Sequence, residues 1–342
     1  MTSRQDELLD AAAGLHDLLD GYWRSQVLCT AARLGIADLL AGGPLTLGEM
    51  AVETGVPCSN LGRLMRALVG LGLCTVGEEG YRTTALGRAL EAGAAGGAYE
   101  RALVTAEVLY PMWAHLTDCL CRGGSAADLR AGWPAVDPTR GPDVVSSLFE
   151  RVAQDLSEPE AQRVAATYAL PERAVLVDVG GGSDALLAEM LRAHPDCRGV
   201  VYDLPGGTDR ALSSLADAGL AARTDVAEGD FLTEVPGGGD VYLLSFVLHA
   251  WDDDHAVTLL RAVRRAMHPG ARLLVVEQTL PGGGEADAAL ASLRDLHMLV
   301  TTGGRERTED EYVALLSAAG LRYTGTVDTG GRNGAIEARP VR

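Results

Sequence analysis

Positive charge is scarce in this sequence of 342 residues. Lysine and arginine together number 29, against 47 aspartates and glutamates, so the formal net charge at pH 7 is −18. A protein that binds nucleic acid or an anionic membrane surface presents basic side chains to the phosphates. The composition therefore argues against nucleic acid and membranes as partners.

The sequence also lacks several signals of location and metal binding. It has no apolar run long enough to span a membrane, and its first residues carry acids in place of an apolar signal core. Its six cysteines are scattered without the spacing of metal ligands. We expect reduced cysteines, no metal site and a cytoplasmic location.

The most informative stretch joins an apolar run, 175–179, to the glycines Gly180, Gly181 and Gly182 and then to a helical pattern. A strand, a glycine turn and a helix in succession allow a ligand to approach the backbone at the start of the helix. The next apolar run ends in Asp203, at the distance where an acid holds the hydroxyls of a ribose. Glycines alone also fit an ordinary tight turn, but together with this acid they favour a nucleoside-containing cofactor.

The N-terminal part reads as helices over 7–42, a short helix after a capping box, a helix over 60–70, and a hairpin over 73–84. This order predicts a winged helix. The helices of 7–42 are more apolar than so small a domain can cover, which indicates a homodimer interface. A DNA-binding regulator is the alternative, although helix 60–70 carries only Arg63 and Arg66.

The remainder of the chain predicts two further parts. Residues 96–170 form a helical linker that contributes to a substrate pocket, following a winged-helix dimerisation domain at 1–95. In 171–342, strands and helices alternate, which predicts a doubly wound, Rossmann-like sheet with its ligand cleft at the carboxyl ends of the strands. Trp113 and Trp133 are candidates for the pocket wall, with core packing as their alternative role.

Ionisable side chains gather at those predicted strand ends: Asp178, Asp203, Asp230, His249 and Glu277. His249 is the side chain among them whose ordinary pKa suits proton removal near pH 7. Glu277 would orient its imidazole, and Glu306 would approach from the far side. A structural histidine at a strand end is the alternative, and the neighbouring carboxylate favours a general base.

Several motifs occur in order along the chain: Leu176-Val-Asp-Val-Gly-Gly-Gly182, Asp203-Leu-Pro205, Gly229-Asp-Phe231, Val247-Leu-His-x-Trp-x-Asp253 and Gly303-Gly-Arg-Glu-Arg-Thr308. As a set they resemble the S-adenosylmethionine (SAM)-dependent small-molecule O-methyltransferases of the plant caffeate and actinobacterial natural-product type. The resemblance covers nearly the whole chain. It implies SAM as cofactor, S-adenosylhomocysteine as product, and an aromatic small molecule as the acceptor of the methyl group.

The resemblance also implies roles for individual residues. His249 would be the general base, flanked by Glu277 and Glu306. The cofactor would be held by residues at the strand ends: Gly180 and Gly182 beside the methionine portion, Asp203 on the ribose hydroxyls, Leu204, Asp230 and Phe231 on the adenine, Ser245 as a polar contact, and Trp251 beside the nucleoside.

Three positions depart from the family pattern. Asp184 stands where the family usually has glycine, Ala250 where it has aspartate, and Ala153 where it often has methionine. The two alanines predict a wider and less polar substrate pocket. Some members of the superfamily use the bound cofactor structurally, in decarboxylation, hydroxylation or rearrangement. Such non-methylating chemistry is the runner-up, and the presence of His249 argues against it.

Overall fold

The computed structural model describes residues 4–129, 159–180, 185–281, 288–330 and 333–341. The chain divides into two compact units, Met1–Tyr110 and Pro111–Arg342. The three-part division at 95 and 170 stays a prediction.

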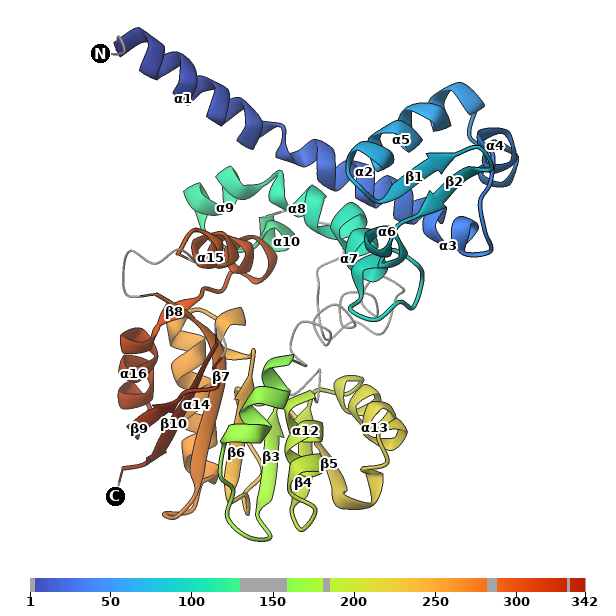
Figure 1. The fold of residues 1–342 in the computed structure, drawn as a ribbon. Helices are drawn as coiled ribbons and strands as arrows, with labels where there is room; N and C mark the ends of the chain where they lie inside the picture. Colours follow the sequence, from blue (N-terminus) through green and yellow to red (C-terminus); the bar gives the residue numbers. More distant parts are fainter. Residues whose placement is uncertain (1–3, 130–158, 181–184, 282–287, 331–332, 342) are drawn as a thin grey trace. The chain divides into compact units, whose positions relative to one another are not determined.

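The first unit is a set of helices followed by a two-stranded hairpin (Figure 1). Thr46 and Glu49 form the predicted capping box at the start of α4. The hairpin is antiparallel, as predicted, and its turn is Gly77-Glu-Glu-Gly80. The elements are α1 (Arg4–Leu19), α2 (Gly21–Arg33), α3 (Ile36–Ala41), α4 (Leu47–Thr54), α5 (Cys58–Gly70), β1 (Cys74–Gly77), β2 (Gly80–Thr83), α6 (Ala85–Arg88), α7 (Ala98–Val104) and the π-helical turn η1 (Thr105–Leu109).

The first unit buries one set of apolar side chains in its core and leaves another set exposed on its surface. Met50, Leu61 and Met65 are fully buried in its core. At the junction of α1 and α2, in contrast, large apolar side chains are each more than half exposed: Leu15, Leu18, Leu19, Tyr22 and Trp23. Burial of such a patch is worth roughly 25 cal/mol per Å², so it favours association with another surface.

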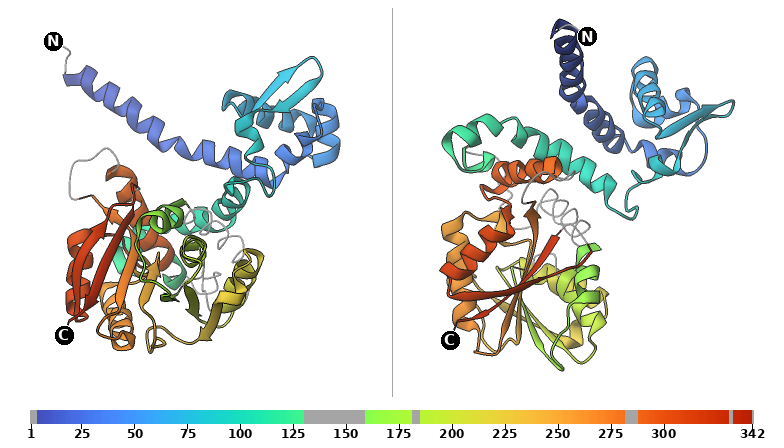
Figure 2. Two further views of the ribbon diagram at one scale, coloured as in Figure 1. Left: turned by 60° about the horizontal axis from the view of Figure 1, so that its bottom comes forward. Right: turned by 60° about the vertical axis from the view of Figure 1, so that its left-hand side comes forward.

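The second unit begins with short helices and continues into the α/β domain. The short helices are α8 (Tyr110–Trp113), α9 (Leu116–Arg122) and α10 (Ala126–Leu129), and a further helix spans 159–167. The later helix α15 (Ala288–Thr302) packs against α9 and α10, as Figures 1 and 2 show. Among all the residues that the structure describes, no helix is long and apolar enough to cross a membrane.

The sheet has the strand order β5-β4-β3-β6-β7-β10-β9, with β8 paired to β7. The pairings from β5 to β7 are parallel and those of β10 are antiparallel. The strands are β3 (Val175–Val179), β4 (Arg198–Asp203), β5 (Thr224–Glu228), β6 (Val241–Ser245), β7 (Arg272–Leu280), β8 (Arg307–Thr308), β9 (Leu321–Val327) and β10 (Asn333–Pro340). The strand order reverses between β3 and β6, and such a switch point is where ligands bind in doubly wound sheets.

Helices cover both faces of this sheet (Figure 2). One core layer contains side chains of α12 (Ala185–Ala193) and α13 (Gly207–Asp217), and the other contains side chains of α14 (Asp253–Ala266) and α16 (Glu309–Ala318). Apolar runs such as Val241–Leu244 are buried because helices lie on both sides of them. The doubly wound sheet predicted from the sequence is confirmed.

The apolar run from Asp240 predicts a strand that extends to His249, and this prediction is too long. β6 ends at Ser245, Phe246 takes a left-handed conformation with φ of 55°, and His249 lies on the 3₁₀ turn η3 (Leu248–Ala250). The chain leaves the sheet here because the carboxylate of Glu277 accepts hydrogen bonds from the amides of Val247 and Leu248. The apolar run gave no sign of this turn, because its capping group comes from another strand.

Candidate active site

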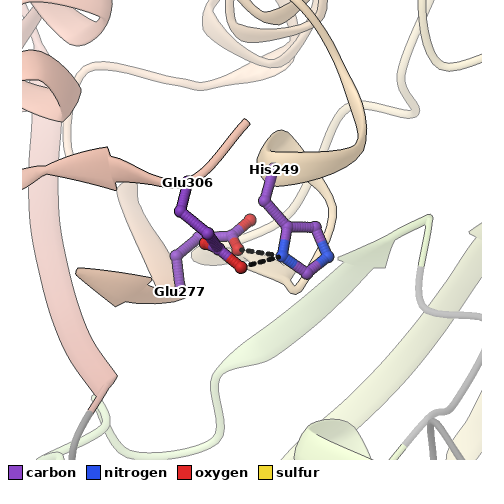
Figure 3. Close-up of side chains that lie close together, drawn as sticks. All are labelled: His249, Glu277 and Glu306. Atoms are coloured by element: carbon purple, nitrogen blue, oxygen red, sulfur yellow. Dashed lines mark hydrogen bonds and ion pairs between the residues drawn. The ribbon is translucent and has the colours of Figure 1, made fainter. Parts of the chain in front are cut away.

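His249, Glu277 and Glu306 lie together, although they come from three separate segments (Figure 3). Nδ1 of His249 lies 3.2 Å from Oε1 of Glu306 and 3.5 Å from Oε2 of Glu277. The His249 side chain is 16% exposed, that of Glu277 0% and that of Glu306 4%. With Nδ1 turned to both carboxylates, the proton of the neutral ring belongs on Nδ1, which leaves the lone pair on Nε2.

The electrostatic environment of the ring follows from these contacts. Burial alone lowers the pKa of His249, but the carboxylates of Glu277 and Glu306 outweigh it and raise the pKa above its ordinary value. Burial raises the pKa of Glu277 as well. A ring that gains a proton at Nε2 is therefore stabilised by two carboxylates at Nδ1, as a general base requires.

Glu277 also shapes the turn on which the histidine sits. Its Oε1 accepts hydrogen bonds from the backbone N–H groups of Val247 at 2.9 Å and Leu248 at 2.7 Å. Its Oε2 faces Nδ1 of His249 at 3.5 Å. The residue predicted to orient the imidazole thus contacts both the ring and the backbone that carries it.

The segment containing Glu306 is fixed against the same turn. The amide of Glu306 donates to Oδ1 of Asp295 on α15 at 2.9 Å, and the amide of Arg305 donates to the carbonyl of His249 at 2.9 Å. Gly304 makes this approach feasible, because a Cβ there would lie 2.1 Å from the carbonyl oxygen of His249. Only a glycine permits the two backbones to come so close.

Reasoning from the sequence missed the residues that hold this arrangement together. Arg307 is fully buried and Asp295 caps the Glu306 segment, yet neither received a role. The signal for Arg307 was its place next to Glu306 in the Gly303–Thr308 motif. The sequence held no comparable signal for Asp295, because its contact depends on how α15 packs.

The structure brings several of the predicted cofactor residues together. Gly180 has φ of 69°, and a Cβ on it would lie 3.3 Å from Val247 and 3.5 Å from the ring of Phe231. The rings of Phe231 and Trp251 meet edge to face, with centroids 6.2 Å apart. The loops after β3, β5 and β6 therefore converge on a space bordered by a glycine and two aromatic rings, which fits a nucleoside-containing cofactor.

The remaining described cofactor candidates are Asp203, Leu204, Asp230 and Ser245. Asp203 ends β4, and its Oδ1 accepts from the amide of Leu204 at 2.7 Å. Burial raises the pKa of Asp203. Asp230 is exposed and accepts from the amide of Leu232, and Ser245 is the last residue of β6. All four candidates lie at the carboxyl edge of the sheet, and Gly182 lies outside the described residues.

An aromatic pair stands on the helices near this edge. Trp113 of α8 stacks on His297 of α15 at an interplanar angle of 20°, and its Nε1 donates to Nδ1 of His297 at 3.2 Å. α15 also carries Asp295, which binds the Glu306 segment. Three further positions from the sequence analysis, Trp133, Ala153 and Asp184, lie outside the described residues.

The cluster of His249, Glu277 and Glu306 also has the composition of a metal site. One ligand atom from each residue lies within 4.8 Å of the others. The contacts at Nδ1 explain the cluster without an ion, because a buried imidazole N–H requires acceptors. The prediction of no metal stays a prediction.

Comparison with known proteins decides the family. Residues 113–322 match the O-methyltransferase domain, and residues 16–92 match the O-methyltransferase dimerisation domain. The chain belongs to the SAM-dependent O-methyltransferase family. SAM is its cofactor and S-adenosylhomocysteine its product. The family assignment confirms the resemblance seen in the sequence and replaces the alternative of a DNA-binding regulator.

Three relatives illustrate the family. The chain is 34% identical to phenazine O-methyltransferase PhzM of Lysobacter antibioticus, over 96% of each protein. It is 36% identical to aclacinomycin 10-hydroxylase RdmB of Streptomyces purpurascens, over 86% of this chain and 80% of that protein. Its fold matches a crystal structure of an O-methyltransferase from neocarzinostatin biosynthesis, in complex with SAM and 2-hydroxy-5-methyl naphthoic acid. That match has a TM-score of 0.79 and 31% identity, over 93% of this chain and 96% of that one.

Proposed function

We propose that this methyltransferase acts on a hydroxyl group of an aromatic natural product and that His249 removes the hydroxyl proton. The observation that carries the proposal is the orientation of the imidazole. Nδ1 faces Glu306 at 3.2 Å and Glu277 at 3.5 Å, so Nε2 is the nitrogen that accepts a proton. Figure 3 shows Nε2 on the side of the ring away from the carboxylates.

Each part of the site contributes one step. SAM, when bound, supplies a methyl group already activated by its sulfonium. The chain's own residues hold the acceptor oxygen in line and take its proton at Nε2 of His249. The carboxylates of Glu277 and Glu306 then stabilise the imidazolium, which gives its proton to solvent after the product leaves.

The cofactor site is proposed at the carboxyl edge of β3, β4, β5 and β6. Gly180 and Gly182 would border the methionine portion, and Asp203 the ribose hydroxyls. Adenine would contact Leu204, Asp230, Phe231 and Trp251, with Ser245 as a polar contact. The approach of Gly180 to Phe231, and of Phe231 to Trp251, supports this placement.

The aromatic nature of the acceptor rests on two supports. Trp113 and His297 form a flat, stacked pair on α8 and α15, and such a pair suits a planar ring. The neocarzinostatin relative is described with a hydroxynaphthoic acid in its complex. We propose a planar hydroxyarene as the substrate class.

Homodimerisation is proposed as well. The apolar patch of Leu15, Leu18, Leu19, Tyr22 and Trp23 is exposed in the isolated unit, and it overlaps the residues that match the dimerisation domain. A second copy of the same patch would cover it symmetrically.

A transfer assay tests the function. The purified protein is mixed with SAM and a panel of hydroxyarenes, including 1,4-dihydroxy-2-naphthoic acid, and both methylated product and S-adenosylhomocysteine are measured by mass spectrometry. We expect the two to appear in equal amounts. The hydroxylase among the relatives makes non-methylating chemistry the specific rival. Conversion of an aromatic compound without formation of S-adenosylhomocysteine would favour that rival.

A further inference from the structure

Arg307 on β8 is a buried cation with an unusual set of partners. Its side chain is among the largest in the chain to be fully buried. Its guanidinium donates to the carbonyls of Leu248 at 3.0 Å and Trp251 at 2.8 Å, and to Oδ1 of Asp253 at 2.8 and 3.0 Å. A buried charge requires such compensation, and the planar fork of arginine suits several acceptors at once.

The two carbonyls are those on either side of His249. Arg307 therefore holds the carbonyl side of the η3 turn, while Glu277 holds its amide side through Val247 and Leu248. The carbonyl of His249 itself accepts from the amide of Arg305. Two amides of the turn are thus bonded to Glu277 of β7, and three of its carbonyls are bonded to Arg305 or Arg307.

The place of Arg307 in the chain gives this arrangement its significance. Arg307 directly follows Glu306, so one short backbone segment brings a carboxylate to the imidazole and a guanidinium to the turn that carries the imidazole. The contacts form a closed ring from His249 to Glu306, along the chain to Arg307, and back through the carbonyl of Leu248. Loosening one contact in such a ring loosens the others.

We propose that Arg307 is a positioning residue that locks the His249 turn onto the Glu306 segment and so fixes the base relative to both of its carboxylates. The proposal rests on the proposed role of His249. The guanidinium contacts Asp253 and the carbonyls of the turn. Its effect passes through the backbone of η3.

Charge adds a second effect to the geometric one. The charged groups that face His249 are Glu277 of β7, together with Glu306 and Arg307 of the segment at β8. Among them, the positive charge of Arg307 lowers the pKa of His249. Around them, the ring of Tyr312 on α16 lies under the guanidinium at 5.9 Å, and Asp253 of α14 is its ion-pair partner. Loss of the guanidinium charge is therefore expected to raise the pKa of the base.

Two variants separate geometry from charge, and a third is the control. Arg307→Met removes both the charge and the hydrogen bonds. Arg307→Lys keeps the charge but cannot reproduce the fork. Arg261→Met is the matched control, because Arg261 of α14 also donates to a backbone carbonyl, that of Ala318 at 3.2 Å, but it is exposed and belongs neither to the His249 turn nor to the Glu306 segment.

The measurements are the kcat and KM values with the best hydroxyarene of the panel, the pH dependence of kcat/KM, and NMR titration of ¹⁵N-labelled histidine, assigned with His249→Ala. For Arg307→Lys we expect kcat to fall on the order of tenfold to a hundredfold with an unchanged KM for SAM. For Arg307→Met we expect the same loss and, in addition, a higher pKa of His249, so the rise of kcat/KM moves to higher pH. Arg261→Met should match the wild type in both kcat and the pKa of His249.

Several outcomes would overturn the proposal. It fails if Arg307→Lys retains wild-type kcat, or if Arg261→Met loses as much kcat as Arg307→Lys. Should the two Arg307 variants not fold, Asp253→Ala decides, because it removes the oxygen that accepts two of the guanidinium's hydrogen bonds and leaves the charge of Arg307 in place. Wild-type kcat together with an unchanged Nδ1–H resonance of His249 in that variant would refute the lock. If no hydroxyarene is methylated, the proposed function fails. An unchanged Nδ1–H resonance of His249 in Arg307→Lys would refute the positioning role of Arg307, whatever the outcome of the methylation assay.

Discussion

The substitution Gly304→Ala provides a demanding test of the site, because its effect can be worked out from distances. A Cβ at position 304 would lie 2.1 Å from the carbonyl oxygen of His249 and 2.5 Å from the carbonyl carbon of Ala250. Real Cβ atoms essentially never come within 3.0 Å of another group, so the two segments must separate by about 0.9 Å. Both obstacles are backbone atoms, which cannot rotate aside.

That separation moves the base away from Glu306. A misplacement of about 1 Å in a reacting group costs on the order of 10²-fold in rate, so we expect kcat to fall about a hundredfold. SAM affinity should change little, because the contact is with the turn that carries the base and not with Gly180 or Asp203. Initial rates and calorimetric titration with SAM measure the two quantities.

The control is Gly237→Ala, in the same domain, where a Cβ would meet only the carbonyl oxygen of Ala266 at an ordinary 3.7 Å. This variant should retain wild-type kcat. Near-wild-type kcat in a folded Gly304→Ala would show that the close approach of the two segments is not needed, and the geometric account of the base would be wrong.

Four further predictions concern the base, its pH dependence, assembly and the cofactor. His249→Ala should lower kcat by ~10²–10⁴ while SAM still binds; near-wild-type turnover in a steady-state assay would remove the base from the mechanism. Because the carboxylates raise the pKa of His249 above 6.5, kcat/KM should rise with pH at a midpoint above that value, and Glu306→Gln should move the midpoint down; an upward shift contradicts the electrostatic account. Light scattering should give twice the chain mass for the full protein, and deletion of residues 1–40 should cause aggregation or inactivity, so a soluble, active monomer would argue against the interface. Asp184→Gly should change SAM affinity by less than about tenfold, or ~1.4 kcal/mol, in calorimetric titration; binding seen only in the variant would show that Asp184 disables the site.

The sequence by itself determined the order of elements and the chemistry available to them. Alternation of apolar runs with helical patterns predicted the doubly wound sheet, and Thr46 with Glu49 predicted the start of α4. A capping box depends on residues three positions apart, and a strand that is buried on both faces is a continuous apolar run. Both features can therefore be recognised from a short stretch of sequence. The motifs named the family for the same reason, because each is a short segment around a strand end.

Only the tertiary structure decided how the base is held. His249 sits on a turn rather than on a strand, because Glu277 of another strand takes up the amides of Val247 and Leu248. Arg307 is buried against the carbonyls of that turn, although an arginine in a polar motif reads as a surface residue. Such contacts join segments far apart in the chain, and their partners are backbone groups that every residue possesses. The side-chain pattern of the sequence therefore does not predict these contacts. They form only when the sheet and its loops have packed.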